Sequence, residues 1–190
     1  MMVVETPKAP YDRPRIWPLS IQAYHALGEL GLIPEKTELF YGQVYHKTPK
    51  SPLHRLLFMR LLDQFQHALP PGPHLQPEQP IICGDSELEP DLSVIRGSIN
   101  DYQTEHPHSA ELVVEICVSG HDYDRSKLRA YAHAGIKEAW FVLAPEQQIE
   151  VYRQPVKEQY LAYLRYDTSQ ALTSTSVPEL TVSLERLFAQ

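Results

Sequence analysis

Residues 111–153 contain the strongest fold signals in the chain, in the sequence ELVVEICVSGHDYDRSKLRAYAHAGIKEAWFVLAPEQQIEVYR. Its first eight residues, ELVVEICV, are apolar and β-branched, which is typical of a buried strand. The run DYDRSKLRAYAHAG then has the character of a helix that ends at Gly135. Two more strand-like runs follow, EAWFVLAP and QQIEVYRQ, with a turn at Pro145-Glu146 between them. This stretch therefore predicts a strand, a helix and two further strands in succession.

Two more helices are predicted on the N-terminal side of this stretch. Ser20 can cap a helix over residues 20–31, and Ser51 can cap a second helix that begins at Pro52 and runs to about Leu69. Apolar residues recur every four positions in the second helix, which predicts one buried stripe. The stripe consists of Leu53, Leu57, Leu61 and Phe65.

Between and after these helices the sequence predicts short strands. TELFYGQVYHK (37–47) alternates around Gly42, which indicates a hairpin, and DLSVI (91–95) is typical of a buried strand. Six prolines from Pro70 to Pro90 predict an irregular or edge-strand connection.

The C-terminal part continues the meander with EQYLAYLRY (158–166), after a turn expected around Pro155. VPELTVSLERLFAQ (177–190) closes the chain as a short strand or helical turn. This order of elements predicts an α/β (α+β) fold, a mixed β-sheet flanked by helices. Residues 1–18, which contain four prolines, are expected to be an extended N-terminal arm, and residues 19–190 a single domain.

Composition excludes several classes of protein. The chain has 190 residues, a formal charge of -7 and two cysteines, Cys83 and Cys117. No apolar run is long enough to span a membrane, and the N-terminus lacks the pattern of a signal peptide. A disulfide framework or structural zinc site is not expected, and we expect a cytoplasmic protein. The acidic balance argues against holding nucleic acid by bulk charge, but not against an enzyme that meets nucleic acid through a metal ion.

Two acidic residues occur where packing alone would not put them. Asp91 opens the DLSVI strand, and Glu115 lies in the middle of LVVEICV, where a carboxylate is costly unless a cation or hydrogen bonds compensate it. Lys127, in the first turns of the following helix, would reach back over the end of the Glu115 strand. Two carboxylates with open positions suit Mg²⁺ or Mn²⁺, and the lysine could orient a water on a phosphate. Together the three residues indicate phosphodiester hydrolysis.

Each of these residues also has a purely structural interpretation. Asp91 alone is more often the solvent-exposed start of a strand, and a helix lysine such as Lys127 is most often solvated. Glu115 could be half-buried and paired with Arg129 or Lys127 without catalytic meaning. Cys117, with His121 four residues later, also invites a thiol-nucleophile interpretation, although a buried cysteine mostly behaves as a small hydrophobic residue.

A family resemblance joins these motifs. The strings PDLSVIRG, ELVVEICVS and above all D-R-x-K-L-x-x-Y-A-x-A-G-I/V-x-E-x-W-x-V, filled here by Asp124 to Val142, resemble the Uma-two family of restriction endonucleases. That family belongs to the P-D…(D/E)-x-K nuclease superfamily, and the resemblance runs from about Thr37 to Tyr152. It implies a restriction-endonuclease-like core with a metal site at one end of the sheet.

The resemblance also implies roles for individual residues. Asp91 would be the metal-binding aspartate and Glu115 the acid of the (D/E)-x-K half-motif, with the backbone carbonyl of Ile116 as a further metal ligand. Glu38 would complete the acidic cluster through a water. His54 matches a histidine that opens the family's second helix, or is simply an exposed first-turn residue.

The chain departs from the superfamily pattern at one position. Cys117 stands where the half-motif expects a lysine, and the resemblance implies that Lys127, on the following helix, takes over that role. The loop before Lys127 also differs from the serine-proline-serine turn of many relatives.

The leading functional hypothesis is a DNA endonuclease that depends on Mg²⁺ (or Mn²⁺). Asp91 and Glu115 would hold the metal, Glu38 would support it, and Lys127 would position the water. Basic residues near these positions in the sequence could meet DNA: Lys47, Lys50, Arg55 and Arg96.

The alternative hypothesis is a non-catalytic, homodimeric binding module that keeps the nuclease scaffold. Tyrosines gather on the predicted C-terminal strands and could form a homodimer surface. They are Tyr152, Tyr160, Tyr163 and Tyr166. A homodimer is also expected for a nuclease that cuts both strands of a duplex, since each site cuts one strand.

Overall fold

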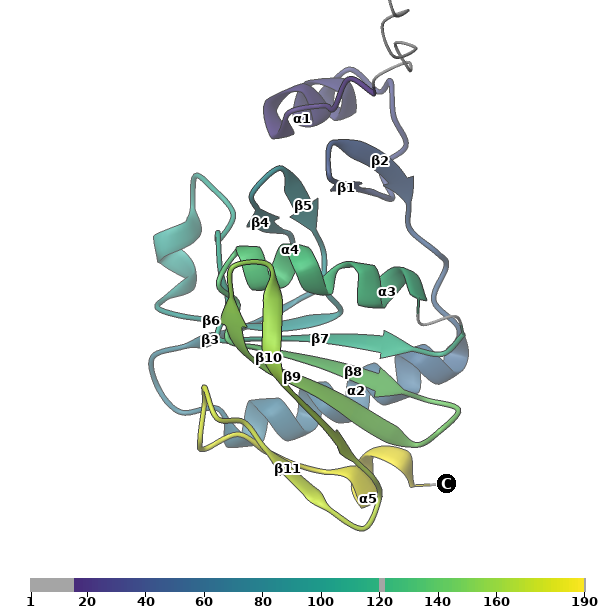
Figure 1. Cartoon of the computed structure of the whole chain (residues 1–190), viewed down its shortest axis with the longest axis vertical. Helices are drawn as coiled ribbons and strands as arrows, with labels where there is room; N and C mark the ends of the chain where they lie inside the picture. The colour runs from purple at the N-terminus through teal and green to yellow at the C-terminus, as the bar shows by residue number, and fades with distance from the viewer. Residues whose placement is uncertain (1–15, 120–121, 190) are drawn as a thin grey trace, which may run out of the picture.

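A mixed six-stranded sheet forms the centre of the computed structural model, which describes residues 16–119 and 122–189 (Figure 1). Across the sheet the order is β10 (Gln159–Tyr166), β9 (Gln148–Val156), β8 (Glu138–Leu143), β7 (Leu112–Cys117), β6 (Leu92–Ile95) and β3 (His74–Pro77). The pair β7–β8 is parallel, whereas the other neighbours in this sheet are antiparallel. The expected mixed sheet is confirmed.

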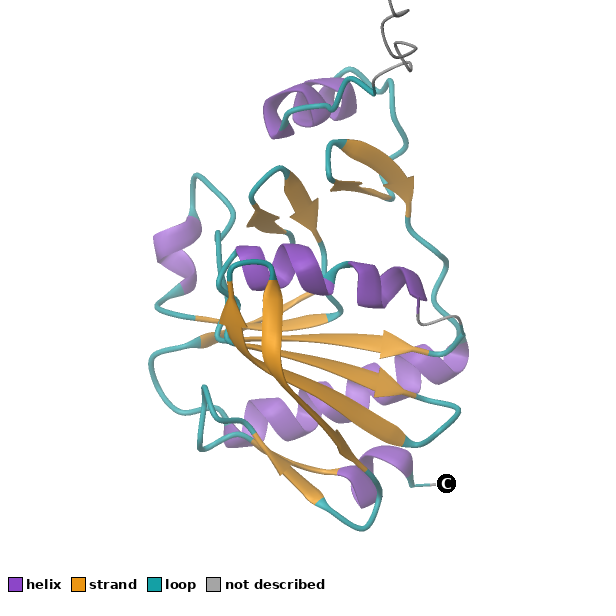
Figure 2. Cartoon of the chain, viewed as in Figure 1, coloured by secondary structure: helices purple, strands orange, loops and turns teal. Residues whose placement is uncertain are grey.

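Helices cover both faces of this sheet (Figure 2). One face packs on α2 (Pro52–Ala68), α5 (Leu184–Phe188) and the hairpin of β11 (Ala171–Thr173) and β12 (Thr181–Ser183). The other face packs on α4 (Leu128–His133), which follows α3 (Asp122–Ser126). Strand β7 serves both cores because successive side chains of a strand point to opposite faces.

That alternation decides where the carboxylate of β7 points. Leu112, Val114 and Ile116 belong to the core on the α2 side. Val113 and Cys117 belong to the core on the α4 side. Glu115 therefore lies on the α4 face.

A smaller four-stranded sheet lies on the α4 side of the molecule (Figure 1). Its order is β2 (Gln43–His46), β1 (Thr37–Phe40), β5 (Ser86–Leu88) and β4 (Ile81–Cys83), with α1 (Ile21–Glu29) beside it and the short 3₁₀ helix η1 (Ile99–Tyr102) further along the chain. The predicted β1–β2 hairpin turns at Tyr41 and Gly42, which have φ angles of 48° and 70°. Only glycine fits the second position, since an added Cβ would lie 2.3 Å from the Cβ of Pro18.

The predicted helix starts are confirmed by their capping geometry. Ser20 Oγ accepts a hydrogen bond from the backbone N–H of Ala23 at 3.1 Å. Ser51 Oγ accepts one from the N–H of His54 at 3.2 Å, with Pro52 in the first turn. Both serines thus satisfy donors that a helix leaves without an intrahelical partner.

The single helix predicted over residues 122–135 is wrong in one respect, because the chain forms two short helices with Lys127 between them. Ser126 Oγ donates to the carbonyl oxygen of Tyr123 at 2.6 Å. In a regular α-helix the N–H of Lys127 would bond to that same carbonyl of Tyr123. Here it bonds to the carbonyl of Asp124 at 3.1 Å. A serine side chain that takes up a backbone carbonyl interrupts the regular ladder, and here it does so next to the lysine.

Two local predictions are also wrong. Pro155 does not mark the turn, because it pairs with Tyr160 inside the β9–β10 ladder, and the chain reverses at residues 157–158. Pairing of β9 with β8 ends at Arg153. Pro155 is therefore paired with β10 alone, and its missing N–H breaks no hydrogen bond to β8. Leu53 is 44% exposed rather than buried. Steps of four residues drift by ~40° each around a helix, so Leu53 lies ~120° from Phe65.

The proline-rich segment between α2 and β6 contains more order than predicted. It forms β3, which is an edge strand as expected, and also β4 and β5 of the smaller sheet. The C-terminal segment forms both a strand, β12, and a helix, α5.

Most of the arm predicted for residues 1–18 lies outside the described residues. Ile16 and Trp17, at the start of the described chain, are exposed. Within residues 16–119 and 122–189, no helix is long and apolar enough to cross a membrane.

Candidate active site

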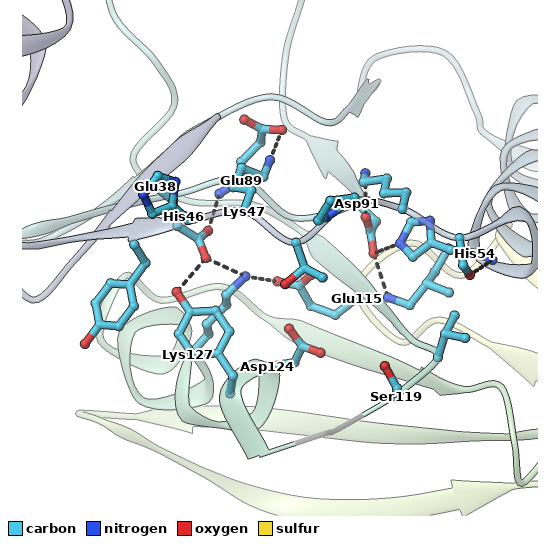
Figure 3. Close-up of a pocket in the computed structure, with 18 residues that line it drawn as sticks. Glu38, His46, Lys47, His54, Glu89, Asp91, Glu115, Ser119, Asp124 and Lys127 are labelled. Carbon is cyan, nitrogen blue, oxygen red and sulfur yellow. Dashed lines mark hydrogen bonds and ion pairs between the residues drawn. The ribbon is translucent and has the colours of Figure 1, made fainter. Parts of the chain in front are cut away.

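A cleft of ≈ 350 Å³ opens where the two sheets approach each other (Figure 3). Its walls come from β1, β2, the segment that joins β2 to α2, the first turn of α2, the segment that joins β5 to β6, the end of β7 and α3 with the residue after it. Charged side chains dominate this lining. They are Glu38, Lys47, Lys50, Glu89, Asp91, Glu115, Asp124 and Lys127, and the imidazoles of His46 and His54 line the cleft beside them.

Asp91 is buried at the start of β6, not exposed to solvent. Leu92 pairs with Val114 in the antiparallel β6–β7 ladder, which brings Asp91 to the level of Glu115. Its Oδ2 accepts hydrogen bonds from the N–H of Ile116 at 2.7 Å and from His54 Nε2 at 3.0 Å.

Lys50 binds the other oxygen of Asp91, with Nζ 2.9 Å from Oδ1. Burial by itself would raise the pKa of Asp91, but His54 and Lys50 outweigh it and lower the pKa below the ordinary value. Asp91 is therefore an ionised carboxylate at the bottom of the cleft.

Glu115 is also buried, and its partner is the lysine rather than an arginine. Lys127 Nζ lies 3.3 Å from Glu115 Oε1, and the hydroxyl of Tyr131 donates to the same oxygen at 2.5 Å. Arg129, the other partner considered from the sequence, binds Glu158 instead.

The pKa of Glu115 is raised, although Lys127 opposes the shift. Burial is the main cause, and the nearby carboxylates of Asp91 and Asp124 add to it. Burial likewise raises the pKa of Asp124. The cleft thus concentrates more carboxylate charge than its side chains alone neutralise.

Lys127 is buried and points into this acidic cluster, as expected from its spacing, so the alternative of a solvated lysine is wrong (Figure 3). Its Nζ lies 3.1 Å from Glu38 Oε1, besides the contact with Glu115. Burial would lower the pKa of Lys127, but the two glutamates outweigh it and raise the pKa above the ordinary lysine value. The side chain is therefore an ammonium ion held between strands β1 and β7.

Glu38 contacts the lysine directly. It extends from β1, and Oε1 also accepts a hydrogen bond from the hydroxyl of Tyr123 at 2.7 Å. Oε2 accepts from the N–H of Glu89 at 3.4 Å. Through these bonds the smaller sheet fixes one side of Lys127.

Ile116 contributes its backbone to the site. Its side chain packs in the core on the α2 side, and its N–H donates to Asp91. The residue also lines the cleft.

Several contacts in the cleft were not predicted from the sequence. Tyr131 had a signal, since it lies one helical turn after Lys127 and belongs to the best-matching family string. Tyr123 and Lys50 had none that specified a partner. The alternative of an exposed His54 is wrong, because the side chain is buried against Asp91 and its Nδ1 has no hydrogen-bond partner among the described residues.

Of the basic residues expected near the site, Lys47 and Lys50 line the cleft and the two arginines do not. Lys47 pairs with Glu89. Arg96 follows the far end of β6 and pairs with Glu111, so the strand itself separates it from Asp91.

The thiol-nucleophile interpretation of Cys117 is not supported. Cys117 is buried and burial raises its thiol pKa, which argues against a thiolate, while His121 lies outside the described residues.

Burial of a carboxylate on a strand does not by itself indicate a functional site. Glu138 and Glu150 are equally buried, but neither lines the cleft. Glu150 on β9 accepts hydrogen bonds from Arg125 at 2.9 and 3.1 Å and from Arg165 at 2.6 Å. Since Arg125 belongs to α3, Glu150 anchors the helix that precedes Lys127.

This anchor predicts a pH-dependent stability. Burial would raise the pKa of Glu150, but hydrogen bonds from the two arginines and from Tyr163 and Tyr152 outweigh it and lower the pKa to about 2. The carboxylate therefore stabilises the fold fully above the unfolded value near 4.5, and that contribution is lost as the pH falls from there towards 2. We expect Glu150→Gln to lower the free energy of unfolding by about 2 kcal/mol at pH 7 and by much less near pH 2.

Urea denaturation at both pH values measures this difference. Glu158→Gln is the matched control, because Glu158 forms an exposed ion pair with Arg129 and should change stability by about 0.5 kcal/mol or less. Equal losses at the two pH values in Glu150→Gln would contradict the proposed anchor.

The donor groups of the cleft fit a hard divalent cation. Among residues 16–119 and 122–189, no group of three or more His, Cys, Asp or Glu side chains is arranged to hold a metal ion. Mg²⁺, however, needs only one or two carboxylates, because it keeps several waters. Asp91 and Glu115 are two such carboxylates at one level of the sheet, and the backbone of Ile116 adjoins them.

Comparison with known proteins gives a family and a fold. The sequence model of the Uma2 (Uma-two) family, described as "Putative restriction endonuclease", matches residues 23–185. A crystal structure of a "putative nuclease belonging to DUF820" from Anabaena variabilis is similar, with a TM-score of 0.71 and 19% sequence identity over 86% of this chain and 97% of that chain. No curated protein matches. The predicted restriction-endonuclease-like core is confirmed.

Proposed function

This chain belongs to the Uma2 family, described as "Putative restriction endonuclease", and from that premise we propose that it is a DNA endonuclease dependent on Mg²⁺ or Mn²⁺. It would hydrolyse phosphodiester bonds at a PD-(D/E)XK-type site. One observation carries the proposal. Lys127, ten positions after the usual place of the motif lysine, reaches the cleft of Asp91 and lies 3.3 Å from Glu115.

Asp91, Glu115 and the backbone carbonyl of Ile116 would hold the metal ion. When bound, the ion supplies a Lewis acid that makes a water nucleophilic at neutral pH and offsets phosphate charge. The oxygen-only donor set suits Mg²⁺ or Mn²⁺ better than zinc.

The remaining residues act on the water and the phosphate. The Lys127 ammonium can donate a hydrogen bond that orients the attacking water, and its charge stabilises the negative charge that develops as the P–O bond breaks. Glu38 on β1 holds that ammonium from the opposite wall of the cleft, and Tyr123 on α3 donates a hydrogen bond to Glu38. Tyr131 fixes the glutamate that faces it.

The burial of Lys127 supports catalysis over a scaffold that has lost its activity. An ion cluster in the interior contributes little net stability, because desolvation offsets the attraction. In a purely structural protein, apolar residues could replace this ion cluster without loss of folding stability. A lysine that opens onto a cleft together with two acids is instead typical of a reactive site.

Cleavage of a supercoiled plasmid tests the proposal. We expect conversion to open circles with Mg²⁺ or Mn²⁺, and none with EDTA. A homodimer, which we also propose, would produce linear plasmid early, since its two sites cut both strands. Cleavage that continues in EDTA would contradict the metal site, and so would a folded protein that neither cleaves nor binds Mn²⁺ in calorimetry.

A further inference from the structure

Lys50 occupies an unusual position in the cleft. It lies in the segment between β2 and α2, which has no regular secondary structure, and a third of its side chain (34%) is exposed. Its Nζ bonds Asp91 Oδ1 at 2.9 Å and also contacts Glu78, a partly exposed side chain. A lysine side chain is an ammonium ion at neutral pH, so both contacts are ion pairs.

The two oxygens of Asp91 are used differently. Oδ2 is committed to the protein, because it accepts from the N–H of Ile116 and from His54. Oδ1 has Lys50 as its bonding partner. The only cation on Oδ1 among the described residues thus comes from a partly exposed side chain on an irregular segment.

A divalent ion on the same oxygen would be incompatible with this contact. The ammonium and the ion would lie within a few ångströms of each other in a partly desolvated cleft, where like charges repel strongly. Metal binding therefore has to release Lys50 from Asp91. The released side chain keeps its contact with Glu78 and stays on the segment that lines the cleft beside Lys47.

We propose that Lys50 is a displaceable cation, which neutralises Asp91 until a metal ion binds and then contacts a phosphate of the nucleic-acid backbone. The inference rests on the proposed function, since it takes Asp91 as a metal ligand. In this proposal Lys50 is a substrate-binding residue. It contacts a phosphate next to the cleaved bond, and it does so only when the metal ion is bound. Metal and nucleic acid then bind cooperatively, because the ion frees a phosphate-binding group.

Calorimetric titration with Mn²⁺ tests the first half of the proposal. Lys50→Ala removes the competitor, so we expect about tenfold tighter Mn²⁺ binding than in the unmodified protein. Lys47→Ala is the charge-matched control, because Lys47 lines the same cleft but pairs with Glu89 rather than Asp91. Its affinity should rise by about threefold or less.

Fluorescence anisotropy with a labelled duplex oligonucleotide tests the second half. Ca²⁺ replaces Mg²⁺ as the oxygen-bound cation, and EDTA provides the metal-free state. In EDTA, Lys50→Ala should bind the duplex as well as the unmodified protein does. With Ca²⁺, the gain in affinity should be about tenfold smaller in the variant than in the unmodified protein.

The outcomes separate failure of this inference from failure of the proposed function. Unchanged or weaker Mn²⁺ binding by Lys50→Ala overturns the inference, and so does an equal gain in Lys47→Ala, which would indicate general electrostatics. Equal loss of DNA affinity with Ca²⁺ and with EDTA would make Lys50 a permanent contact and also overturns it. If Asp91→Ala binds Mn²⁺ as tightly as the unmodified protein, the metal site itself is wrong.

Discussion

Lys127→Met is expected to reduce Mg²⁺-dependent DNA cleavage by about 10²- to 10³-fold, the loss typical of removing one preorganised charge from a reaction centre. Methionine keeps much of the length of the side chain and removes the ammonium that lies 3.1 Å from Glu38 and 3.3 Å from Glu115. Metal binding should be retained or tightened, because a competing positive charge has gone. Plasmid cleavage and Mn²⁺ calorimetry on the same preparation measure the two effects.

Stability must be measured beside activity in this variant. Loss of the ammonium leaves two buried glutamates without their cation, which costs about 3 kcal/mol unless they take up protons. Circular dichroism at the assay temperature shows whether the variant is folded. Lys137→Met is the control, since Lys137 is a half-exposed lysine that pairs with Glu111 and does not line the cleft.

Two results would contradict the role of Lys127. Full cleavage by folded Lys127→Met would discard the lysine assignment while keeping the metal site. A loss of cleavage that is matched by the loss in Lys137→Met would indicate a general effect of removing a positive charge.

Asp91→Asn is expected to abolish both metal binding and cleavage. The amide has nearly the same shape, and its oxygen can still accept from the N–H of Ile116, so the β6–β7 connection at 2.7 Å should persist. The negative charge, however, is gone, and a hard divalent cation depends on it. We expect Mn²⁺ affinity to fall by at least about 100-fold, beyond the 10- to 100-fold that loss of an outer-shell group costs.

Asp63→Asn provides the matched control. Asp63 is an exposed aspartate on α2 that pairs at the surface with His67 and Arg186, and the substitution removes the same charge outside the cleft. Its Mn²⁺ affinity and cleavage should be unchanged. Retained Mn²⁺ binding in Asp91→Asn would contradict the proposed metal site directly.

Much of the framework could be predicted because the signals are local. Ser20 and Ser51 cap their helices as expected, since a cap depends on residues within one turn. The β-branched run around Glu115 forms a central strand because such residues suit a sheet buried on both faces. The break between the two helices at Lys127 was not predicted, because it depends on which backbone carbonyl accepts the hydrogen bond of the Ser126 hydroxyl.

Of the acids that line the cleft, the sequence predicted Glu38, Asp91 and Glu115 but neither Glu89 nor Asp124. Asp91 and Glu115 stood out because burial of a carboxylate in a strand requires compensation. Lys127 could be named from its spacing, but its contact with Glu38 depends on how the smaller sheet sits beside α3. Arg96 was expected near the site because it is close to Asp91 along the chain, yet an extended strand carries it away by ~3.3 Å per residue.

The family, the mixed sheet between helices and the acidic pair of the cleft could all be predicted from the sequence. These follow from periodicity, caps and motif strings, which are properties of neighbouring residues. Tertiary structure alone decided the partners of those acids: Lys50 and His54 reach Asp91 across 41 and 37 positions, and Tyr123 reaches Glu38 across 85. Such contacts depend on which faces the chain topology brings together, and side-chain spacing along the sequence carries no record of that.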